Sequence, residues 1–415
     1  MQPYDMKELE ERVILVGVQE SFSEDVEESL DELAELCETA GALVVGRVIQ
    51  NREKIHPGTY VGKGKIEEIA LLMEELGATG IVCDDELSPA QLNNLEKELD
   101  CKVMDRTLII LDIFAARANT SEGNIQVELA QLRYRAARLV GLRNSLSRLG
   151  GGIGTRGPGE KKLEMDRQLI HARISQLKAE LAQVQKHREL IRSKRKKDQM
   201  VVAAIVGYTN AGKSTLLNTL TDAGVLEEDK LFATLDPTTR LLELPGGQNI
   251  LLTDTVGFIR KLPHHLIEAF KSTLEEAKYA DIIIHVVDAS NPQKEKQMHV
   301  VYETLKDLGV KDQPILTLFN KQDRIENPEI LKDMKADKTL KISAKTGKGL
   351  DDLKDELEKI LCARSILLER VFPYEKAGLI QIVRAKGQLL EEEYRGDGIY
   401  VKAFVPAEIY GKVAY

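Results

Sequence analysis

Apolar residues follow two alternating patterns along the first hundred or so positions. Four short runs have the length and composition of buried strands, at residues 13–18, 42–45, 80–83 and 101–104. Between them, apolar residues recur every three or four positions, as in amphipathic helices, over residues 26–39, 66–76 and 89–99. Alternating strands and helices favour a largely parallel sheet, so residues 1–125 are predicted to form an α/β domain.

The period changes after this domain. Apolar side chains step by three and four from Ile125 to Leu142 and, after an interruption, again from Leu163 to Ile191. The interruption at 150–159 is rich in glycine. Residues 126–198 are therefore predicted to form a long antiparallel helical hairpin with a glycine-rich tip. Its second helix, from residue 160 to about 197, would extend over roughly 50 Å.

Strand and helix patterns return after residue 199. Apolar strands are expected at 201–206, 241–244, 249–254, 282–288, 314–319 and 340–342, with helices between the later ones. His285 lies inside one apolar run and is expected to be a core residue. The fold class is α/β: the N-terminal domain and hairpin, a second α/β domain at 199–365, and a small C-terminal α+β domain at 366–415, with strands expected at 379–383 and 399–405.

The composition is that of an ordinary globular protein. With 415 residues, 43% hydrophobic and 30% charged, the chain should hold two to four domains. It has no run of about 18 apolar residues, and its first residues lack a signal-peptide core. We therefore expect a cytoplasmic protein, with peripheral membrane association left open. Its four cysteines lack metal-ligand spacing and are expected to be buried thiols.

The net charge of −9 conceals a basic segment. Residues 131–200 carry 18 Lys and Arg against 6 Asp and Glu. A polyanion such as RNA could bind this segment, and Arg156 at the tip could approach it closely because the neighbouring glycines have no side chains. The alternative is a flexible turn between helices with solvated charged faces.

A loop with phosphate-binding spacing follows the strand at 201–206. Glycines at both ends let the backbone wrap round a phosphate chain, so that N–H groups and a helix dipole face the anion. Lys213 is expected to reach the β- and γ-phosphates as a catalytic group, and Ser214 to offer its hydroxyl to Mg²⁺. The expected binding residues are Gly207, Tyr208, Thr209, Asn210, Ala211, Gly212, Lys213 and Ser214.

Two further motifs identify the base. Asp323 can accept hydrogen bonds from guanine N1–H and the exocyclic amine, which adenine lacks, while Lys321 lies along the base plane. A short run after the next strand could close the other side of the base. The residues concerned are Asn320, Lys321, Gln322 and Asp323, then Ser343, Ala344 and Lys345. Because they follow the phosphate loop in this order, they indicate guanine, and residues 199–365 are predicted to form a P-loop (Ras-like) GTPase domain.

The remaining nucleotide motifs lie between these two. Asp254 is placed to hold Mg²⁺ through water and the Gly257 N–H to sense the γ-phosphate, with Thr255 and Val256 between them. Ahead of them, a segment containing Phe232, Ala233, Thr234, Leu235 and Asp236 can supply a second hydroxyl to Mg²⁺. Thr234 is the preferred ligand and Thr238 the reserve. Segments held only while the γ-phosphate is present would form a two-state switch.

Phe258 follows Gly257, where a Ras-like enzyme has the glutamine that orients the attacking water. An apolar ring cannot perform that task, so slow hydrolysis that a partner accelerates is expected. The alternative is that Phe258 only packs and backbone groups position the water.

Two other glycine-rich stretches carry incomplete motifs. The turn from Tyr60 to Lys65 precedes a helix, and a plain helix-entry turn is preferred to a phosphate site because the full loop spacing is missing. The run from Gly152 to Gly157 has the glycine spacing of a dinucleotide fingerprint. It follows a helix instead of a strand, so that interpretation is rejected.

The motifs at 207–214, 232–238, 254–258 and 320–323, preceded by Gly62 to Lys65 and Gly154 to Glu160, resemble those of the HflX family of ribosome-associated GTPases. The resemblance covers nearly the whole chain. The GTPase motifs are shared with other translation GTPases, whereas the α/β domain and glycine-tipped hairpin are particular to this family.

The resemblance implies a GTP hydrolase that uses GTP/GDP and Mg²⁺ and is stimulated by the ribosome. It implies that the hairpin tip, from Gly150 to Glu160 with Arg156, contacts rRNA of the large (50S) subunit near the peptidyl-transferase region, and that the factor splits stalled or idle ribosomes under stress. A monomer off the ribosome, without stable membrane insertion, is expected. Some relatives hydrolyse ATP through the N-terminal domain, to which the Gly62 turn lends thin support.

Two rival functions share these motifs. A ribosome-assembly GTPase would have every nucleotide residue in common, and precursor particles in a deletion strain would favour it. The second rival is a non-ribosomal GTP switch for a protein partner. It predicts that neutralising Arg156, Lys161 and Lys162 leaves ribosome association unchanged.

Overall fold

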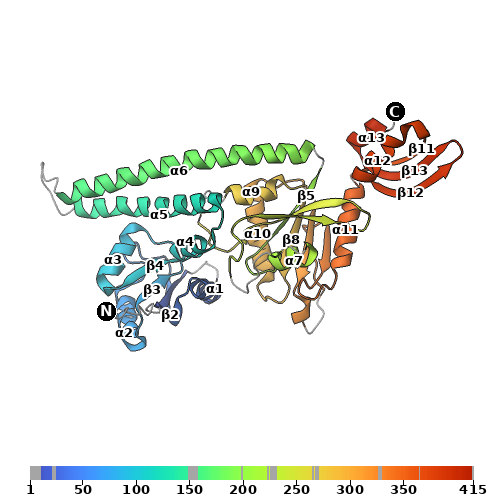
Figure 1. The fold of residues 1–415 in the computed structure, drawn as a ribbon. Helices are drawn as coiled ribbons and strands as arrows, with labels where there is room; N and C mark the ends of the chain where they lie inside the picture. Colours follow the sequence, from blue (N-terminus) through green and yellow to red (C-terminus); the bar gives the residue numbers. More distant parts are fainter. Residues whose placement is uncertain are drawn as a thin grey trace, which may run out of the picture. The chain divides into compact units, whose positions relative to one another are not determined.

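The computed structural model describes residues 11–20, 25–147, 158–197, 200–221, 224, 231–263, 266, 271–325, 330–363 and 365–413 (Figure 1). These fall into two compact units. The first comprises residues up to 192 together with 228–236 and 259–273, and the second comprises 193–227, 237–258 and 274–415. The expected tip residues 150–157, including Arg156, lie outside the described residues, as do the side chains of 158–163.

The first unit begins with a four-stranded sheet in the order β2-β1-β3-β4, and all its strands are parallel. The strands are β1 (Arg12–Glu20), β2 (Leu43–Arg52), β3 (Gly80–Cys83) and β4 (Lys102–Asp105). The helices between them are α1 (Val26–Thr39), α2 (Lys63–Leu76) and α3 (Pro89–Leu99). Their apolar faces pack on the sheet, as in the core formed by Ile14, Val16, Ile66 and Ile81. The predicted parallel α/β sheet is confirmed.

Local signals explain where these helices begin and end. The Ser88 hydroxyl accepts the Gln91 N–H while the Gln91 side chain accepts the Ser88 N–H, a reciprocal cap that starts α3. Gly77 ends α2 with φ 61°, a left-handed conformation that favours glycine. The Gly62 N–H donates to Gln50 Oε1 and α2 begins at the next residue, which is the geometry of the helix-entry turn.

A further helix, α4 (Arg106–Arg117), was not expected. The Asp105 carboxylate caps its start by accepting the Leu108 N–H at 2.9 Å. Its middle is almost continuously apolar, and Ile109, Ile110, Leu111, Ile113 and Phe114 are all buried. Because the helix buries more than one face, the three-to-four spacing that marks a surface helix is absent from its sequence.

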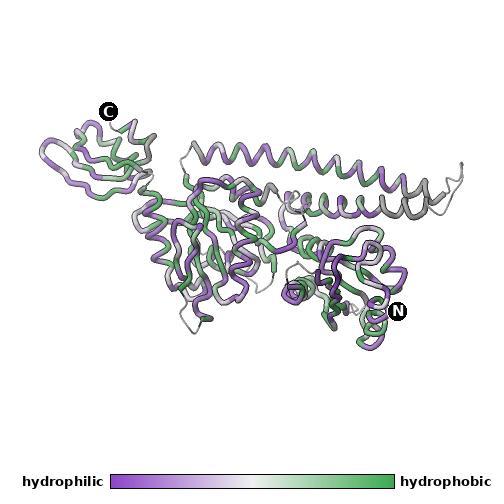
Figure 2. The backbone as a smooth tube through the Cα atoms, turned by 180° about the vertical axis from the view of Figure 1, so that it is seen from behind, coloured by the Kyte–Doolittle hydropathy of each residue, from purple (hydrophilic) through white to green (hydrophobic). Residues whose placement is uncertain are grey.

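The predicted helical hairpin is present. Helix α5 (Ser121–Ser147) and helix α6 (Pro158–Lys197) run side by side (Figure 1). Leu129, Ile174 and Leu177 form their buried seam. Along the α6 trace, hydrophobic and hydrophilic positions alternate (Figure 2).

Polar contacts fix α5 to the sheet. The Asp105 carboxylate accepts the Tyr134 hydroxyl at 2.8 Å and pairs with the Arg138 guanidinium at 2.6 Å. The same guanidinium lies 3.1 Å from the centroid of the Tyr134 ring. The Asp105 carboxylate, which also caps α4, therefore joins the end of β4 to two helices.

The second unit contains a six-stranded sheet in the order β10-β9-β8-β5-β7-β6, parallel except for the edge strand β6. Its strands are β5 (Val201–Gly207), β6 (Thr238–Glu243), β7 (Asn249–Asp254), β8 (Ile282–Asp288), β9 (Ile315–Asn320) and β10 (Lys338–Lys341). Its helices are α7 (Lys213–Thr221), α9 (Lys271–Tyr279, whose first residues belong to the first unit), α10 (Lys294–Leu308) and α11 (Leu350–Ala363), with the short 3₁₀ helix η1 (Gln322–Arg324).

His285 lies in the middle of β8 and is buried. Burial lowers the pKa of His285 to about 4, so the imidazole is neutral near pH 7. Its ring packs edge-on against Tyr302 with centroids 5.2 Å apart. The predicted core position of His285 is confirmed, although its buried Nδ1 has no hydrogen-bond partner among the described residues.

The C-terminal part of the second unit is a three-stranded antiparallel sheet in the order β11-β13-β12. Its elements are β11 (Ser365–Phe372), η2 (Tyr374–Lys376), α12 (Ala377–Lys386), β12 (Gln388–Arg395), β13 (Gly398–Pro406) and α13 (Ala407–Val413). Residues 379–383, expected to be a strand, lie in α12, and that prediction is wrong. Ile380 and Val383, one helical turn apart, both enter the core, a spacing that a run of five residues could not distinguish from a strand.

No helix in the described parts of the chain is long and apolar enough to cross a membrane.

Candidate nucleotide-binding site

The candidate site lies where parallel strands of the second unit end. β5 pairs with β7 on one side and β8 on the other, and β9 pairs with β8. The expected nucleotide motifs follow the carboxyl ends of β5, β7, β9 and β10 in turn. Loops at this edge of a parallel sheet are where α/β proteins bind ligands.

The phosphate loop, residues 208–212, depends on one close approach. Gly212 has φ 94°, and a Cβ built there would lie 2.3 Å from Nδ2 of Asn320. Asn210 also adopts a left-handed conformation, with φ 59°. Only glycine fits at position 212 without displacing the Asn320 amide.

Lys213 begins α7, and the residue is only 6% exposed. The ammonium donates to the carbonyl oxygen of Tyr208 at 2.8 Å, which folds the side chain back over the loop. Burial lowers the pKa of Lys213 to about 8, although the nearby Asp254 carboxylate acts in the opposite direction. A buried cation at the end of a glycine-rich loop suits an incoming phosphate.

Ser214 and Asp254 form a pair suited to a magnesium ion. The Ser214 hydroxyl donates to the Asp254 carboxylate at 2.8 Å, and that carboxylate is fully buried at the end of β7. One hydroxyl and one carboxylate, completed by water and phosphate oxygens, are typical of Mg²⁺ in nucleotide sites. Among the described residues, no cluster of three or more His, Cys, Asp or Glu could hold a metal by itself.

Gly257 lies against the phosphate loop. A Cβ built on Gly257 would be 2.9 Å from Thr209 Cα and 3.0 Å from Lys213 Nζ. Any side chain there would therefore push against the ammonium. Next in the chain, the Phe258 N–H donates to the Gly207 carbonyl and the Phe258 carbonyl accepts the Thr209 N–H at 2.8 Å.

The Phe258 ring is buried, with 1% of the residue exposed. Its backbone bonds to the phosphate loop and its side chain contributes to the core. Phe258 therefore fixes the position of Gly257, and the protein has no polar side chain at this position to orient water.

Asn320 connects the phosphate loop with the base-binding loop. Its amide donates to the Ala211 carbonyl at 2.9 Å, and its side-chain oxygen accepts the Ala344 N–H at 2.9 Å. Both amide groups of this buried side chain are thus used within the protein. The sequence predicted Asn320 as a binding residue, and the structure gives it a bridging role.

The base-recognition residues are held in place beside it. Lys321 adopts a left-handed conformation with φ 61°, and its ammonium pairs with Asp288 at 2.9 Å. The Ser343 hydroxyl donates to the Asp323 carboxylate at 2.6 Å, and this hydrogen bond lowers the pKa of Asp323. Asp323 is exposed, so a base can reach it.

Other predicted residues occupy neighbouring positions. Val256 is buried, Thr255 donates its hydroxyl to the Ile205 carbonyl at 2.7 Å, and Gln322 donates to the Phe319 carbonyl. Lys345 is exposed, and the reserve residue Thr238 begins β6 opposite Asp254. Asp288 was missed, although an acidic residue at the end of an apolar strand beside these loops was an available signal.

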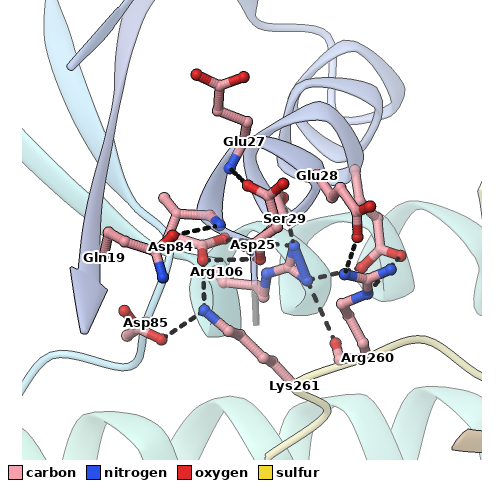
Figure 3. A network of polar contacts seen from close by, with 12 residues as sticks. Gln19, Asp25, Glu27, Glu28, Ser29, Asp84, Asp85, Arg106, Arg260 and Lys261 are labelled. Carbon is pink, nitrogen blue, oxygen red and sulfur yellow. Dashed lines mark hydrogen bonds and ion pairs between the residues drawn. The ribbon is translucent and has the colours of Figure 1, made fainter. Parts of the chain in front are cut away.

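The remaining predicted segment, which contains Thr234, belongs to the first unit together with the residues that follow Phe258 in the chain. The Lys261 ammonium pairs with Asp84 and, at 2.7 Å, with Asp85 (Figure 3). Burial lowers the pKa of Lys261, but the two carboxylates outweigh burial and raise it.

Arg106 completes this network. Its guanidinium pairs with Glu32 at 2.8 Å. It also donates to the Arg260 carbonyl at 3.3 Å (Figure 3). The structure therefore attaches residues 260 and 261 to the carboxyl edge of the N-terminal sheet. Sequence reasoning missed this attachment because its acidic partners lie more than 170 positions away from Lys261.

Comparisons with known families cover most of the chain. Models described as the N-terminal and middle regions of GTP-binding GTPases match residues 27–115 and 117–195, and a model described as 50S ribosome-binding GTPase matches residues 202–321. GTPase HflX of Lacrimispora saccharolytica is 69% identical over 410 residues, which cover 99% of this chain and 97% of that protein.

The chain belongs to the HflX family of GTPases. GTPase HflX of Escherichia coli is 43% identical over 353 residues, covering 84% of this chain and 83% of that protein. A solved structure of a GTP-binding protein from Sulfolobus solfataricus with GDP is 26% identical, with a TM-score of 0.45, and covers 84% of this chain and 98% of that one. As a member of the HflX family, the chain binds GTP and GDP and hydrolyses GTP.

The pKa of Lys213 predicts how GDP binding depends on pH. A phosphate prefers the charged ammonium, so GDP affinity should be constant below about pH 8 and then fall by up to about tenfold per pH unit as Lys213 loses its proton. Titration calorimetry between about pH 7 and pH 9 measures this. GMP has the same base but no β-phosphate, so its affinity should change little. Equal pH dependence for GDP and GMP would contradict the role of Lys213.

The predicted role of Asp323 can be tested by changing its donors and acceptors. Asp323→Asn places an amide donor against the guanine amine, so GTP should bind roughly 10²-fold or more weakly than to the wild type. Xanthosine triphosphate has a carbonyl at that position, so the variant should bind it better than the wild type does. Competition binding compares the two nucleotides. Ser343→Ala removes the hydrogen bond to Asp323 but keeps the carboxylate, and should weaken GTP without favouring xanthosine triphosphate.

Proposed function

We propose that this GTPase binds the large (50S) ribosomal subunit through its basic hairpin and uses GTP binding and hydrolysis to dissociate stalled or idle ribosomes, notably under stress. The observation that carries the proposal is the hairpin itself: a two-helix arm, basic in sequence and fixed to an α/β sheet, in a chain with a guanine-nucleotide site. The family match to 50S ribosome-binding GTPases supports the choice of partner.

Ion pairs join the two helices of the arm. Arg173 pairs with Glu128 through two bonds of 2.7 and 2.8 Å, and Arg188 pairs with Glu122 at 2.9 Å. These pairs connect α6 to α5 and neutralise part of the positive charge. Other cations stay exposed along α6, namely Lys178, Lys186 and Lys194. The arm therefore keeps cations for phosphate contacts.

In the nucleotide site, Lys213 binds the β- and γ-phosphates, Ser214 and Thr234 hold Mg²⁺ directly, and Asp254 holds it through water. When bound, Mg²⁺ neutralises charge on the phosphate oxygens. The Gly257 N–H senses the γ-phosphate, and Asp323 with Ser343, Ala344 and Lys345 encloses the guanine. Because Phe258 offers only backbone groups, the group that orders the attacking water comes from the ribosome.

Co-sedimentation with purified large subunits tests the proposal. Binding should be stronger with a non-hydrolysable GTP analogue than with GDP and should weaken steeply with salt. Replacing Arg156, Lys161 and Lys162 with Gln should reduce the slope of log affinity against log salt by about 0.7–0.9 for each phosphate that the variant no longer neutralises.

The matched control replaces three exposed lysines of the second unit, Lys306, Lys311 and Lys359, with Gln. The control should leave the salt slope nearly unchanged. Equal effects of the two triple variants, or equal binding in both nucleotide states, would contradict the proposal. Gradient profiles distinguish splitting from assembly: added protein with GTP should convert intact ribosomes into subunits.

A further inference from the structure

The Asp236 carboxylate holds the residues that lead into α5. One oxygen accepts the backbone N–H groups of Asn119 at 3.0 Å and Thr120 at 2.9 Å, and the other accepts the Thr120 hydroxyl at 2.5 Å. All of these residues belong to the first unit. A single carboxylate in segment 232–236, which contains Thr234, thus bonds to three donors at the start of the hairpin.

The bonds of Asp236 are not needed to cap the start of α5. The Thr120 hydroxyl already accepts the Gly123 N–H at 2.9 Å, which is the usual side-chain cap for the start of α5. Asp236 instead bonds to backbone groups that precede the first turn. The contact is also close, since a Cβ built on Gly123 would lie 2.5 Å from Asp236 Oδ1.

The other end of the same segment is also anchored in the first unit. The Phe232 ring packs edge-on against Phe114 of α4, with centroids 4.7 Å apart and an interplanar angle of 77°. Phe232 has φ 54°, an uncommon conformation for an aromatic residue that persists only where packing fixes it. The two anchors, Phe232 and Asp236, lie two residues either side of Thr234.

From this arrangement we propose that Asp236 is a positioning residue: it fixes Thr234 for Mg²⁺ and couples the nucleotide state to the start of α5. The inference rests on the proposed roles of Thr234 and of the hairpin. Because Thr234 lies between two anchors that both contact the first unit, we expect a γ-phosphate that orders Thr234 to order the start of α5 as well. By linkage, a partner that holds α5 changes the preference for GTP over GDP by the same factor.

The test compares affinities for GDP and for a non-hydrolysable GTP analogue at several Mg²⁺ concentrations, in the full chain without ribosomes. Asp236→Ala should leave GDP affinity within about twofold and weaken analogue binding by roughly tenfold, the usual size of such coupling. The Mg²⁺ concentration required for analogue binding should rise. Hydrogen exchange in the first turn of α5 should then no longer differ between the two nucleotides.

Two further variants separate positioning from helix capping. Asp25→Ala removes a carboxylate cap of the same type from α1, where Asp25 accepts the Glu27 N–H at 3.0 Å, and should not alter the ratio of the two affinities. Gly123→Ala favours the helix, because alanine is the better helix former, but its Cβ would lie 2.5 Å from Asp236 Oδ1 and 3.2 Å from the Thr120 hydroxyl oxygen, so the Asp236 carboxylate must shift most. If Asp236 positions Thr234, Gly123→Ala should weaken analogue binding as Asp236→Ala does. If Asp236 only caps the helix, Gly123→Ala should not weaken analogue binding.

An unchanged affinity ratio in Asp236→Ala, or stronger analogue binding, would overturn the inference. Retained GDP affinity shows that the variant is folded. The proposed ribosomal function is tested independently. If wild-type protein couples its nucleotide state to the start of α5 but does not bind large subunits, only the ribosomal function is contradicted.

Discussion

The nucleotide site depends on keeping the charged ammonium of Lys213 out of water. Burial opposes the charge, and the Tyr208 carbonyl and the Asp254 carboxylate compensate for it. This arrangement has space because positions 212 and 257 are glycines. A Cβ built at either position would lie within 3.0 Å of a neighbouring group. Asn320 then joins the loop around Lys213 to the loop that recognises the base.

The first unit is organised around buried charges of both signs. The Asp84 carboxylate accepts the Ser29 hydroxyl and pairs with Arg106 and Lys261. The Asp105 carboxylate caps α4, accepts the Tyr134 hydroxyl and pairs with Arg138. Removing one member of such a buried pair costs roughly 3–5 kcal/mol, because the other charge remains uncompensated. These contacts therefore specify where the hairpin and residues 260 and 261 attach, more than they add to overall stability.

Much of this architecture was predictable from sequence. The strand and helix patterns predicted the parallel N-terminal sheet, the strands of the second sheet and the hairpin, and the motif spacing predicted the GTPase identity that the family matches confirm. Helix α4 was missed because its buried faces remove the helical period, and residues 379–383 were assigned to a strand because five residues fit either period. The four domain boundaries, the individual nucleotide contacts and the tip contact remain predictions.

The contacts of Asp236 and Lys261 illustrate what sequence cannot supply. Each side chain bonds to residues more than 115 positions away, and neither has a spacing signal to mark its partner. Asp236 was predicted to bind nucleotide because it lies in a motif, whereas its described bonds are to the start of α5. Such pairings follow from tertiary packing, which a single sequence does not encode as a local pattern.

We propose that GTP hydrolysis depends on the ribosome, because the buried Phe258 offers only backbone groups at the position where a Ras-like enzyme has its water-orienting glutamine. The most direct test is the GTP turnover rate of the wild-type protein, measured alone and with saturating large ribosomal subunits. We expect slow turnover of the protein alone and an increase of about 10³-fold or more with subunits, comparable to supplying a missing catalytic group in related enzymes. Fast turnover alone that subunits do not change would contradict it.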